Sequence, residues 1–244
     1  MSARDYASLI KLSHSVFALP FALLALFVAD KEPKAFTVLM CLLAVVSART
    51  SAMAYNRYVD RDLDAQNPRT ANREIPRGAI PARRALGLAL GSGAVFLMSC
   101  WALGPLCAAM GVPLLLWLLL YSHTKRFTAF CHLWLGVALG LAPLSAWVAA
   151  RGTLDDLSTP LCLALGVTLW VAGFDITYAC QDAAFDERHG LHSIPARFGV
   201  RRSLWIARVL HLLAFALFAA FGQMASLTTA FPFGLAAALV LLSW

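Results

Sequence analysis

The stretch AFTVLMCLLAVVSARTSAMAYNRYVDRDLD, residues 35–64, changes character along its length. Its first part, residues 35–55, is mostly apolar, and the part that begins at Asn56 is crowded with aspartates and arginines. An α-helix crosses the hydrocarbon core of a bilayer with about twenty apolar residues. The stretch therefore predicts a membrane-spanning helix that ends in a charged cluster, and charge at such a place seldom lacks a task.

The composition of the whole chain extends this interpretation. Of its 244 residues, 60% are hydrophobic and only 14% are charged, which is too little charge to cover a soluble domain of this size. Long apolar runs recur from end to end, and none shows the alternating pattern of a membrane barrel. The sequence predicts an all-α, polytopic transmembrane helix bundle, built as a single domain within a lipid bilayer.

Eight spans are expected, each long enough to cross a bilayer. The last of them is still apolar at Trp244 and carries no basic tail, so we expect that this is not the natural end of the chain. The spans cover about residues 12–30, 35–55, 85–103, 106–122, 129–149, 160–181, 203–222 and 228–244.

Basic and non-basic connections between these spans alternate. Arg4 and Lys11 precede the first span, and the connections at 56–84, 122–128 and 182–202 are rich in arginine or lysine. Excess Lys and Arg mark cytoplasmic loops. The N-terminus and these three loops are therefore predicted to lie on the cytoplasmic side of the cell inner membrane. They also account for the net charge of +7, which then indicates no nucleic-acid partner.

The first charged cluster forms a column on one face of a helix. Asn56, Asp60 and Asp64 are spaced four apart, so they project from the same side, whereas Asp62 points to the other side. Arg49 lies a turn or two deeper on the same stripe. The second predicted span thus extends past the bilayer edge and presents two carboxylates together.

A second column stands at the end of the span predicted at 160–181. Asp175, Tyr178, Asp182 and Asp186 are spaced three or four apart and share one face. Both spans run towards the cytoplasm in the predicted topology. The two columns should therefore end at the same membrane surface, where they can face each other.

Facing carboxylates repel unless positive charge lies between them. Oxygen ligands without His or Cys suit a hard cation, and Mg²⁺ takes one or two carboxylates together with substrate phosphates. The repeated D-x-x-x-D spacing therefore predicts a diphosphate held between two Mg²⁺ ions. Lys125, Arg126 and Arg73 lie on the same side and can neutralise the remaining oxygens. A diphosphate inside an apolar bundle favours an isoprenyl diphosphate as substrate.

The residues of both columns resemble the UbiA superfamily of intramembrane aromatic prenyltransferases. The motif N-x-x-x-D-x-x-x-D stands at 56–64, followed by RTANREIPRG, and Y-x-x-x-D-x-x-x-D stands at 178–186. A G-x-x-S-I-P-x-x-F-G stretch follows at 190–199, and YSHTKRFT and LGLAPLSAW also look like the family. The resemblance covers about residues 8–200. The family usually has nine helices, so the last one would be missing here.

The resemblance implies roles for individual residues. Asn56 would assist one ion, and Tyr178 and Asp175 would line the active site beneath the diphosphate. Lys11 stands where a cation holds the carboxylate of the aromatic substrate, although many members have Arg there and lysine lacks its bidentate fork. Arg49 is a second candidate for that task. The expected metal ligands are Asn56, Asp60, Asp64, Asp182 and Asp186, and the expected diphosphate ligands are Arg73, Lys125 and Arg126.

The resemblance implies Mg²⁺-dependent transfer of a polyprenyl group from polyprenyl diphosphate to an aromatic ring carbon. The expected acceptor is an aromatic acid, 4-hydroxybenzoate, on the way to ubiquinone. A hydroxynaphthoate acceptor of menaquinone biosynthesis is the alternative, which NREIPRG and HSVFALPF favour.

A transporter or ion pathway is the alternative outside the enzymes. Transporters often contain inverted repeats and broken helices. Here both Asp columns lie on helices of the same predicted direction, and no chain of charges crosses to the far side. The D-G-x-x-A-R signature of phosphatidyl-alcohol transferases is absent from the sequence. These features favour the prenyltransferase.

Overall fold

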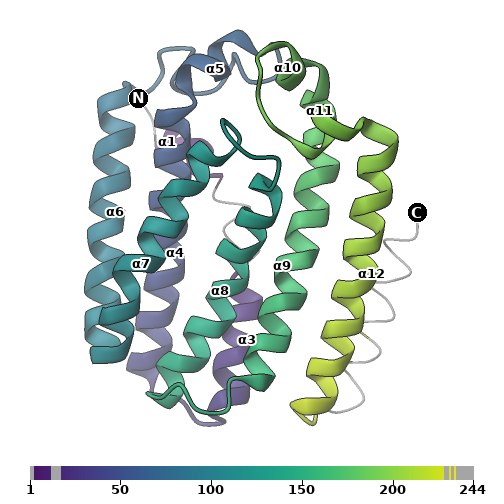
Figure 1. Ribbon diagram of the computed structural model, residues 1–244. Coiled ribbons are helices and arrows are strands. Elements are labelled where there is room, and N and C mark those ends of the chain that lie inside the picture. The colour runs from purple at the N-terminus through teal and green to yellow at the C-terminus, as the bar shows by residue number, and fades with distance from the viewer. Residues whose placement is uncertain (1–2, 12–17, 228–230, 232–233, 235–244) are drawn as a thin grey trace. The chain divides into compact units, whose positions relative to one another are not determined.

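The computed structural model describes residues 3–11, 18–227, 231 and 234. All regular structure in these residues is helical, which confirms the all-α class (Figure 1). The elements are α1 (Ala3–Leu9), α3 (Leu19–Ala29), α4 (Ala35–Val59), α5 (Arg61–Gln66), α6 (Ala82–Leu103), α7 (Pro105–Thr124), α8 (Cys131–Arg151), α9 (Ser158–Ala179), the 3-10 turn η1 (Cys180–Asp182), α10 (Ala183–Arg188), α11 (Ile194–Phe198) and α12 (Val200–Met224).

Six of these helical segments are long and apolar enough to cross a membrane: α4, α6, α7, α8, α9 with its continuation to Arg188, and α12. They match six of the eight predicted spans, and the protein is a multi-pass membrane protein. The first predicted span is represented by the shorter apolar helix α3, because residues 12–17 lie outside the described part of the chain. The eighth, at 228–244, lies outside it too, apart from residues 231 and 234.

The chain divides into two compact units. The first unit comprises residues 1–20 and 33–124, and the second comprises residues 21–32 and 125–244. Each of the two charged columns belongs to a different unit. The expectation of a single domain stays a prediction.

The first unit is built on α4, which packs against α6 and α7. Its contact with α6 is close because small residues meet there: the Ser51 hydroxyl donates to the Ala89 carbonyl at 2.8 Å, and a Cβ built on Gly93 would lie 3.3 Å from the Ser51 hydroxyl. Small residues let membrane helices approach each other. Phe96 and Cys100 of α6 and Ala44 and Ala48 of α4 form the buried centre of this packing.

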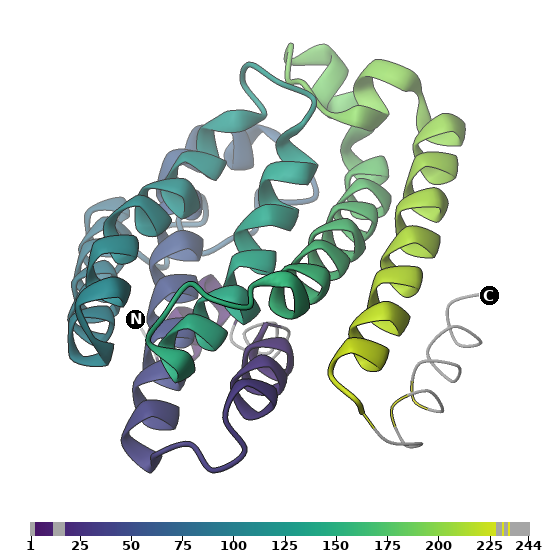
Figure 2. The same ribbon diagram turned by 60° about the horizontal axis from the view of Figure 1, so that its bottom comes forward.

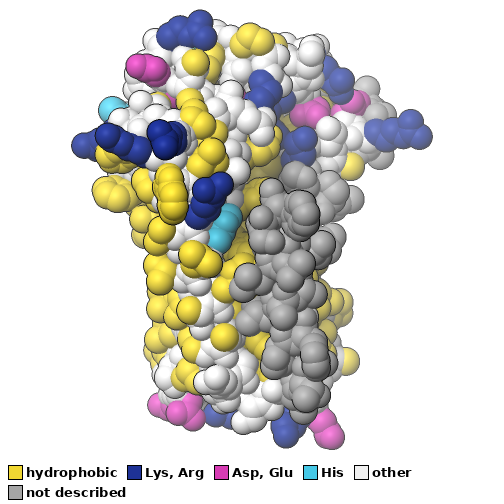
Figure 3. Space-filling view, turned by 90° about the vertical axis from the view of Figure 1, so that its right-hand side faces the viewer, with side chains coloured by type: hydrophobic (Ala, Val, Ile, Leu, Met, Phe, Trp, Pro, Cys, Tyr) yellow, Lys and Arg dark blue, Asp and Glu magenta, His cyan; other side chains and the backbone are white. Residues whose placement is uncertain are grey.

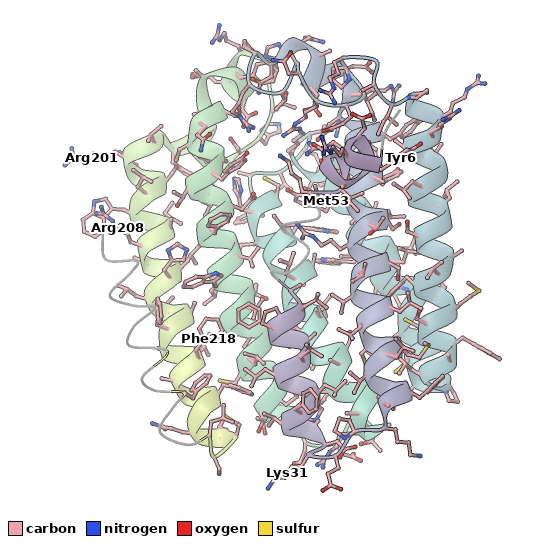
Figure 4. The ribbon with its side chains drawn as sticks, turned by 180° about the vertical axis from the view of Figure 1, so that it is seen from behind. Tyr6, Lys31, Met53, Arg201, Arg208 and Phe218 are labelled. Carbon is pink, nitrogen blue, oxygen red and sulfur yellow. The ribbon has the colours of Figure 1, made fainter. Side chains whose placement is uncertain are left out.

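The second unit is built on α9, with α8 on one side and α12 on the other (Figure 2). A Cβ on Gly136 or Gly140 of α8 would lie 2.3 Å from an oxygen of Thr168, so only glycine permits this helix contact. On the other side of α9, Phe218 of α12 points inward, and a Cβ on Gly166 of α9 would lie 2.7 Å from its ring (Figure 4). Phe218 also stacks on Phe21 of α3 with ring centroids 5.9 Å apart. This packing fixes α9 on both sides.

Charge in each unit is concentrated where the long helices end. Figure 3 shows hydrophobic side chains along the helices and most of the lysines, arginines and acids near their ends. In the first unit, α5 and a loop to residue 81 follow α4, and in the second, η1, α10 and α11 follow α9. Each acidic motif therefore lies at the transition from a membrane-spanning helix to a polar connection.

Candidate active site

The first acidic motif straddles a helix break. α4 ends at Val59, and Asp60 adopts φ −90° and ψ 3° before α5 begins. The hydrogen-bond register nevertheless continues, since the Asp60 N–H donates to the Asn56 carbonyl at 2.9 Å and the Asp64 N–H donates to the Asp60 carbonyl at 2.7 Å. The expected column on a single helix is thus interrupted at Asp60 but keeps its four-residue spacing.

The side chains of this motif lie as the spacing predicts. The Asn56 amide donates to Asp60 Oδ2 at 3.2 Å. Asp60 and Asp64 are buried, 3% and 6% exposed, whereas the Asp62 side chain is 79% exposed beside Arg61. The prediction that Asp62 points away from the column is confirmed.

Two arginines surround the carboxylate of Asp64. Arg73 Nη1 donates to Asp64 Oδ1 at 2.7 Å, and Arg57 Nη1 lies 4.0 Å from Asp64 Oδ2. Arg57 is itself 4% exposed, so this charge pair is withdrawn from solvent. Oδ2 of Asp64 is buried and accepts no hydrogen bond from the described residues, which leaves it available as a ligand.

The loop after α5 is folded back and tied in place. The Thr70 hydroxyl donates to the Asp64 carbonyl at 3.0 Å. The buried Glu74 accepts a 2.5 Å hydrogen bond from the Ser8 hydroxyl of α1, and Arg77 pairs with Asp5 at 2.9 Å. These contacts explain how a segment rich in arginine holds Arg73 on the motif.

Two cations predicted to hold the aromatic carboxylate also belong to the first unit. Arg49 lies within α4, nearly two turns before Asn56, and is half-buried. Lys11 follows α1, is exposed and has a positive φ of 51°. Their proposed task remains a prediction.

The second acidic motif also runs from a long helix into shorter ones, but its carboxylates are less buried. α9 ends at Ala179, η1 contains Asp182, and α10 contains Asp186. Both carboxylates are partly exposed, in contrast to the buried pair of the first unit. The Ser193 side chain forms a hydrogen bond with Asp186, and Lys125 and Asp182 lie close enough to act on its charge.

The remaining candidates of the second unit flank this motif. Tyr178 is 46% exposed near the end of α9. Lys125 and Arg126 are partly exposed in the connection between α7 and α8. The Lys125 carbonyl accepts a hydrogen bond from the His192 N–H at 2.7 Å, so this connection is fastened to the segment after α10. Lys125 is thereby held beside Asp186.

Sequence reasoning missed His132. This residue is 2% exposed, and its Nδ1 lies 2.7 Å from Asp175 Oδ2. Its other ring nitrogen, Nε2, lies 3.3 Å from the backbone N–H nitrogen of Ile194. The available signal was a polar side chain within an apolar span, because such residues face a bundle interior and pair with other polar groups.

The donor set suits one kind of metal. No group of three or more His, Cys, Asp or Glu side chains converges within the described ranges, so a site made wholly of protein ligands is not formed there. Mg²⁺ instead keeps waters and takes one or two carboxylates along with substrate phosphates. The unused, buried Oδ2 of Asp64 and the partly exposed carboxylates of the second motif fit such an ion.

Comparison with known proteins identifies the family to which this sequence is similar. The UbiA prenyltransferase family matches residues 18–244. The 4-hydroxybenzoate octaprenyltransferase of Aromatoleum aromaticum is 31% identical over 194 residues, which are 80% of this chain and 65% of that protein. The aligned part covers 59% of the next such relative, from Nitrosomonas eutropha, so the chain spans less than two thirds of these relatives.

Solved structures give the same result. A UbiA homolog from Aeropyrum pernix, in its apo form, superposes with a TM-score of 0.87 at 33% identity, covering 92% of this chain and 84% of that one. A UbiA homolog from Archaeoglobus fulgidus, bound to DMAPP and Mg²⁺, superposes with a TM-score of 0.78. At 21% identity, with 97% of this chain and 85% of that one covered, the second likeness bears on the fold alone.

Proposed function

Since this chain belongs to the UbiA prenyltransferase family, we propose that it transfers a polyprenyl group from a polyprenyl diphosphate to a ring carbon of an aromatic acid. The observation that carries the proposal is the repeated acidic motif. One copy ends α4 and the other follows α9, so each lies where a membrane-spanning helix meets a polar connection. A substrate with an apolar prenyl chain and a charged diphosphate head requires a site where an apolar helix meets a polar connection.

Mg²⁺ is the proposed cofactor, with one ion on each motif. Asp60 and Asp64 would hold the first ion with the help of Asn56, and Asp182 and Asp186 would hold the second. The donor set described above fits this metal, and the Archaeoglobus homolog, which shares the fold, is bound to DMAPP and Mg²⁺. The bound ions would stabilise the diphosphate as it leaves the allylic carbon.

Three cations are proposed to bind the diphosphate. Lys125 lies beside Asp186, and Arg126 follows it. Arg73 donates to Asp64 through Nη1, which leaves other N–H groups of its guanidinium for a phosphate oxygen. Arg73 would therefore orient a metal-binding carboxylate and contact the substrate at once.

The chemistry requires a group that accepts a proton. When the C–O bond to diphosphate breaks, the ring carbon beside the phenolic hydroxyl attacks the allylic C1 and then loses its proton. Asp175 is proposed to take this proton, because its carboxylate is held by His132 and is 22% exposed. Tyr178, one turn later on α9, would line the same part of the site.

The proposed acceptor is 4-hydroxybenzoate, in agreement with the names of the relatives from Aromatoleum and Nitrosomonas. Lys11 or Arg49 would pair with its carboxylate. A hydroxynaphthoate of the menaquinone pathway is the alternative acceptor. We place the N-terminus and both motifs on the cytoplasmic side of the inner membrane, where basic connections prevail.

A direct assay tests this proposal. Membranes containing the protein are incubated with a radiolabelled polyprenyl diphosphate and, separately, with 4-hydroxybenzoate, a hydroxynaphthoate and benzoate. We expect a prenylated product from a hydroxyaromatic acid and none from benzoate, which lacks the activating hydroxyl. Activity should disappear with EDTA and return with Mg²⁺.

Two outcomes would contradict the proposal. Turnover that persists in EDTA would refute the metal-held diphosphate. A protein that forms no product with any acceptor, yet carries cations across proteoliposomes, would instead be the transporter that the intramembrane charges also allow.

A further inference from the structure

His132 connects two segments of the second unit that the proposed function uses separately. It stands at the start of α8, and its ring is buried. Nδ1 lies 2.7 Å from Oδ2 of Asp175 on α9. Nε2 lies 3.3 Å from the backbone nitrogen of Ile194, the first residue of α11.

These two contacts determine which ring nitrogen carries the proton. A backbone N–H can only donate, so Nε2 must accept from Ile194 and carry no hydrogen. The proton is then on Nδ1, which donates to the carboxylate of Asp175. A doubly protonated ring would set two N–H groups against each other at Ile194. Both nitrogens of His132 are thus occupied, and neither is open to a substrate.

The segment that His132 holds reaches the second acidic motif. The Ser193 hydroxyl accepts from the Ala196 N–H at 3.3 Å and forms a hydrogen bond with the Asp186 side chain. The neighbouring His192 N–H donates to the Lys125 carbonyl at 2.7 Å. A single buried ring therefore links Asp175 to the segment that orients Asp186.

We propose that His132 is a positioning residue: it orients the carboxylate of Asp175 and, through Ile194, holds the segment that contains Ser193, and it exchanges no proton during the reaction. This inference rests on the proposed function, which assigns Asp175 and Asp186 to the active site. The contact uses Oδ2 of Asp175 and leaves the second carboxylate oxygen for the substrate.

Two substitutions separate hydrogen bonding from proton transfer. His132→Leu keeps a buried apolar side chain and removes both hydrogen bonds. His132→Gln supplies an amide N–H for Asp175 and an amide oxygen for Ile194, but it cannot take up a proton at neutral pH. We expect kcat to fall about tenfold or more in His132→Leu, as for a lost hydrogen bond to a charged group, and to recover most of the way in His132→Gln.

A matched control removes a buried hydrogen bond from the same unit. Thr168 donates to the Ala164 carbonyl at 2.8 Å within α9, two turns before Asp175. Thr168→Val should leave kcat within about twofold of the wild type. Equal losses in His132→Gln and His132→Leu would overturn the proposal, because they would point to a titrating ring, and so would full activity in His132→Leu.

A double-mutant cycle tests whether His132 acts through Asp175. Asp175→Ala should lower kcat by itself, and adding His132→Leu to it should cost little more, since the carboxylate to be oriented is gone. Independent, multiplying losses would overturn the proposed route.

Hydrogen exchange keeps the inference testable whatever the reaction turns out to be. In the full chain in detergent, the Ile194 amide should exchange several-fold faster in His132→Leu than in the wild type or in His132→Gln, as measured by mass spectrometry of peptides covering 190–197. Absence of prenyl transfer in the wild type would reject the proposed function alone. Unchanged exchange in His132→Leu would reject the role of His132 alone.

A separate observation concerns the outer face of α12. Arg201, Trp205 and Arg208 are spaced four and three apart, so they share one helix face, and all are exposed. The guanidinium of Arg208 lies 5.6 Å from the centre of the Trp205 ring. Figure 4 shows Arg201 and Arg208 pointing away from the bundle. The sequence contains no Asp or Glu after Glu187, so α12 itself offers these arginines no acidic partner.

The position of Arg208 within a membrane-capable helix indicates what this face binds. α12 is one of the membrane-capable helices, and Arg208 lies within the span predicted at 203–222, about 12 Å along the helix axis from its first residue, Val200. An arginine within a membrane-spanning helix is energetically costly unless its long side chain reaches a polar group at the membrane interface. Exposed tryptophans are typical of that interface. We infer that the face formed by Arg201, Trp205 and Arg208 binds the phosphate headgroup of an anionic phospholipid.

Native mass spectrometry of the detergent-purified protein tests this inference. Phosphatidylglycerol should remain bound after delipidation better than phosphatidylcholine, and Arg208→Gln should reduce the bound fraction several-fold. Arg83→Gln, which removes an exposed arginine at the start of α6, is the matched control and should leave binding unchanged. Equal retention of both lipids, or equal binding by wild type and Arg208→Gln, would overturn the inference.

Discussion

The two acidic motifs share a spacing but not an environment. In the first unit, Asp60 and Asp64 are buried, and Arg57 and Arg73 surround Asp64 at 4.0 Å and 2.7 Å. In the second unit, Asp182 and Asp186 are partly exposed, and a hydrogen bond with the Ser193 side chain orients Asp186.

The difference indicates two ways of keeping carboxylates at a membrane helix end. A buried carboxylate needs a fixed counter-charge, because an unpaired one is strongly unfavourable. A partly exposed carboxylate needs only orientation, since water screens its charge. We therefore expect both motifs to serve the same reaction, whereas the first should also be part of what holds its unit together.

The largest expected effect is on catalysis and should be symmetric. Asp60→Ala and Asp182→Ala should each lower kcat/KM about a thousandfold, because each removes a proposed ligand of the Mg²⁺ that would stabilise the leaving diphosphate. Prenyl transfer to 4-hydroxybenzoate in membranes measures this. The control is Asp62→Ala, which alters the exposed aspartate between Asp60 and Asp64 and should retain activity. Full activity in either motif variant would remove that motif from the reaction.

The next effect should be asymmetric and concerns stability. Asp64→Ala removes the largest of the negative charges that act on the buried Arg57, leaving Glu74 and Asp60, and should destabilise the first unit by about 3 kcal/mol. Asp186→Ala removes a partly exposed carboxylate and should cost less than about 1 kcal/mol. Thermal unfolding in detergent compares the two variants. Equal destabilisation would show that burial does not separate the motifs.

Replacing the cations that flank the two motifs should give the same asymmetry in stability, with smaller effects. Arg73→Gln should raise the KM for the prenyl diphosphate about tenfold and also lower the unfolding temperature, because Asp64 loses its 2.7 Å partner. Lys125→Gln should raise the same KM by a similar factor with little change in unfolding temperature. Steady-state kinetics and thermal melts of both variants provide the comparison; a stable Arg73→Gln protein would contradict it.

The smallest effect is expected at Lys11. If this lysine pairs with the acceptor carboxylate, Lys11→Ala should raise the KM for 4-hydroxybenzoate several-fold and leave the KM for the prenyl diphosphate unchanged, as for an exposed ion pair. Lys11→Arg should retain or improve acceptor binding through its bidentate fork. Equal changes in both KM values would exclude Lys11 from this role and leave Arg49 as the candidate.

Much of the first motif could be predicted from sequence because its contacts are local. The four-residue spacing placed Asn56 against Asp60 and turned Asp62 outward, as the 3.2 Å hydrogen bond and the exposed Asp62 confirm. The break at Asp60 was not foreseen. The side-chain spacing alone does not distinguish a continuous helix from two helices that share one hydrogen-bond register.

His132 could not be assigned in the same way. Its partners, Asp175 and Ile194, lie 43 and 62 residues away along the chain. Nothing near residue 132 indicates which polar group will meet the ring. The same holds for Glu74, whose hydrogen bond to Ser8 spans 66 residues.

The sequence by itself determined the all-α membrane class, the six spans that the structure describes in full and the location of the acidic motifs at helix ends. Apolar length and helical spacing are properties of short segments. The thickness of the bilayer and the geometry of the helix therefore determine their outcome directly. Tertiary structure decided which arginine neutralises Asp64, why one motif is buried and the other partly exposed, and that His132 joins Asp175 to the Ser193 segment. Those outcomes depend on how helices pack, and packing brings together residues whose relation no local pattern records.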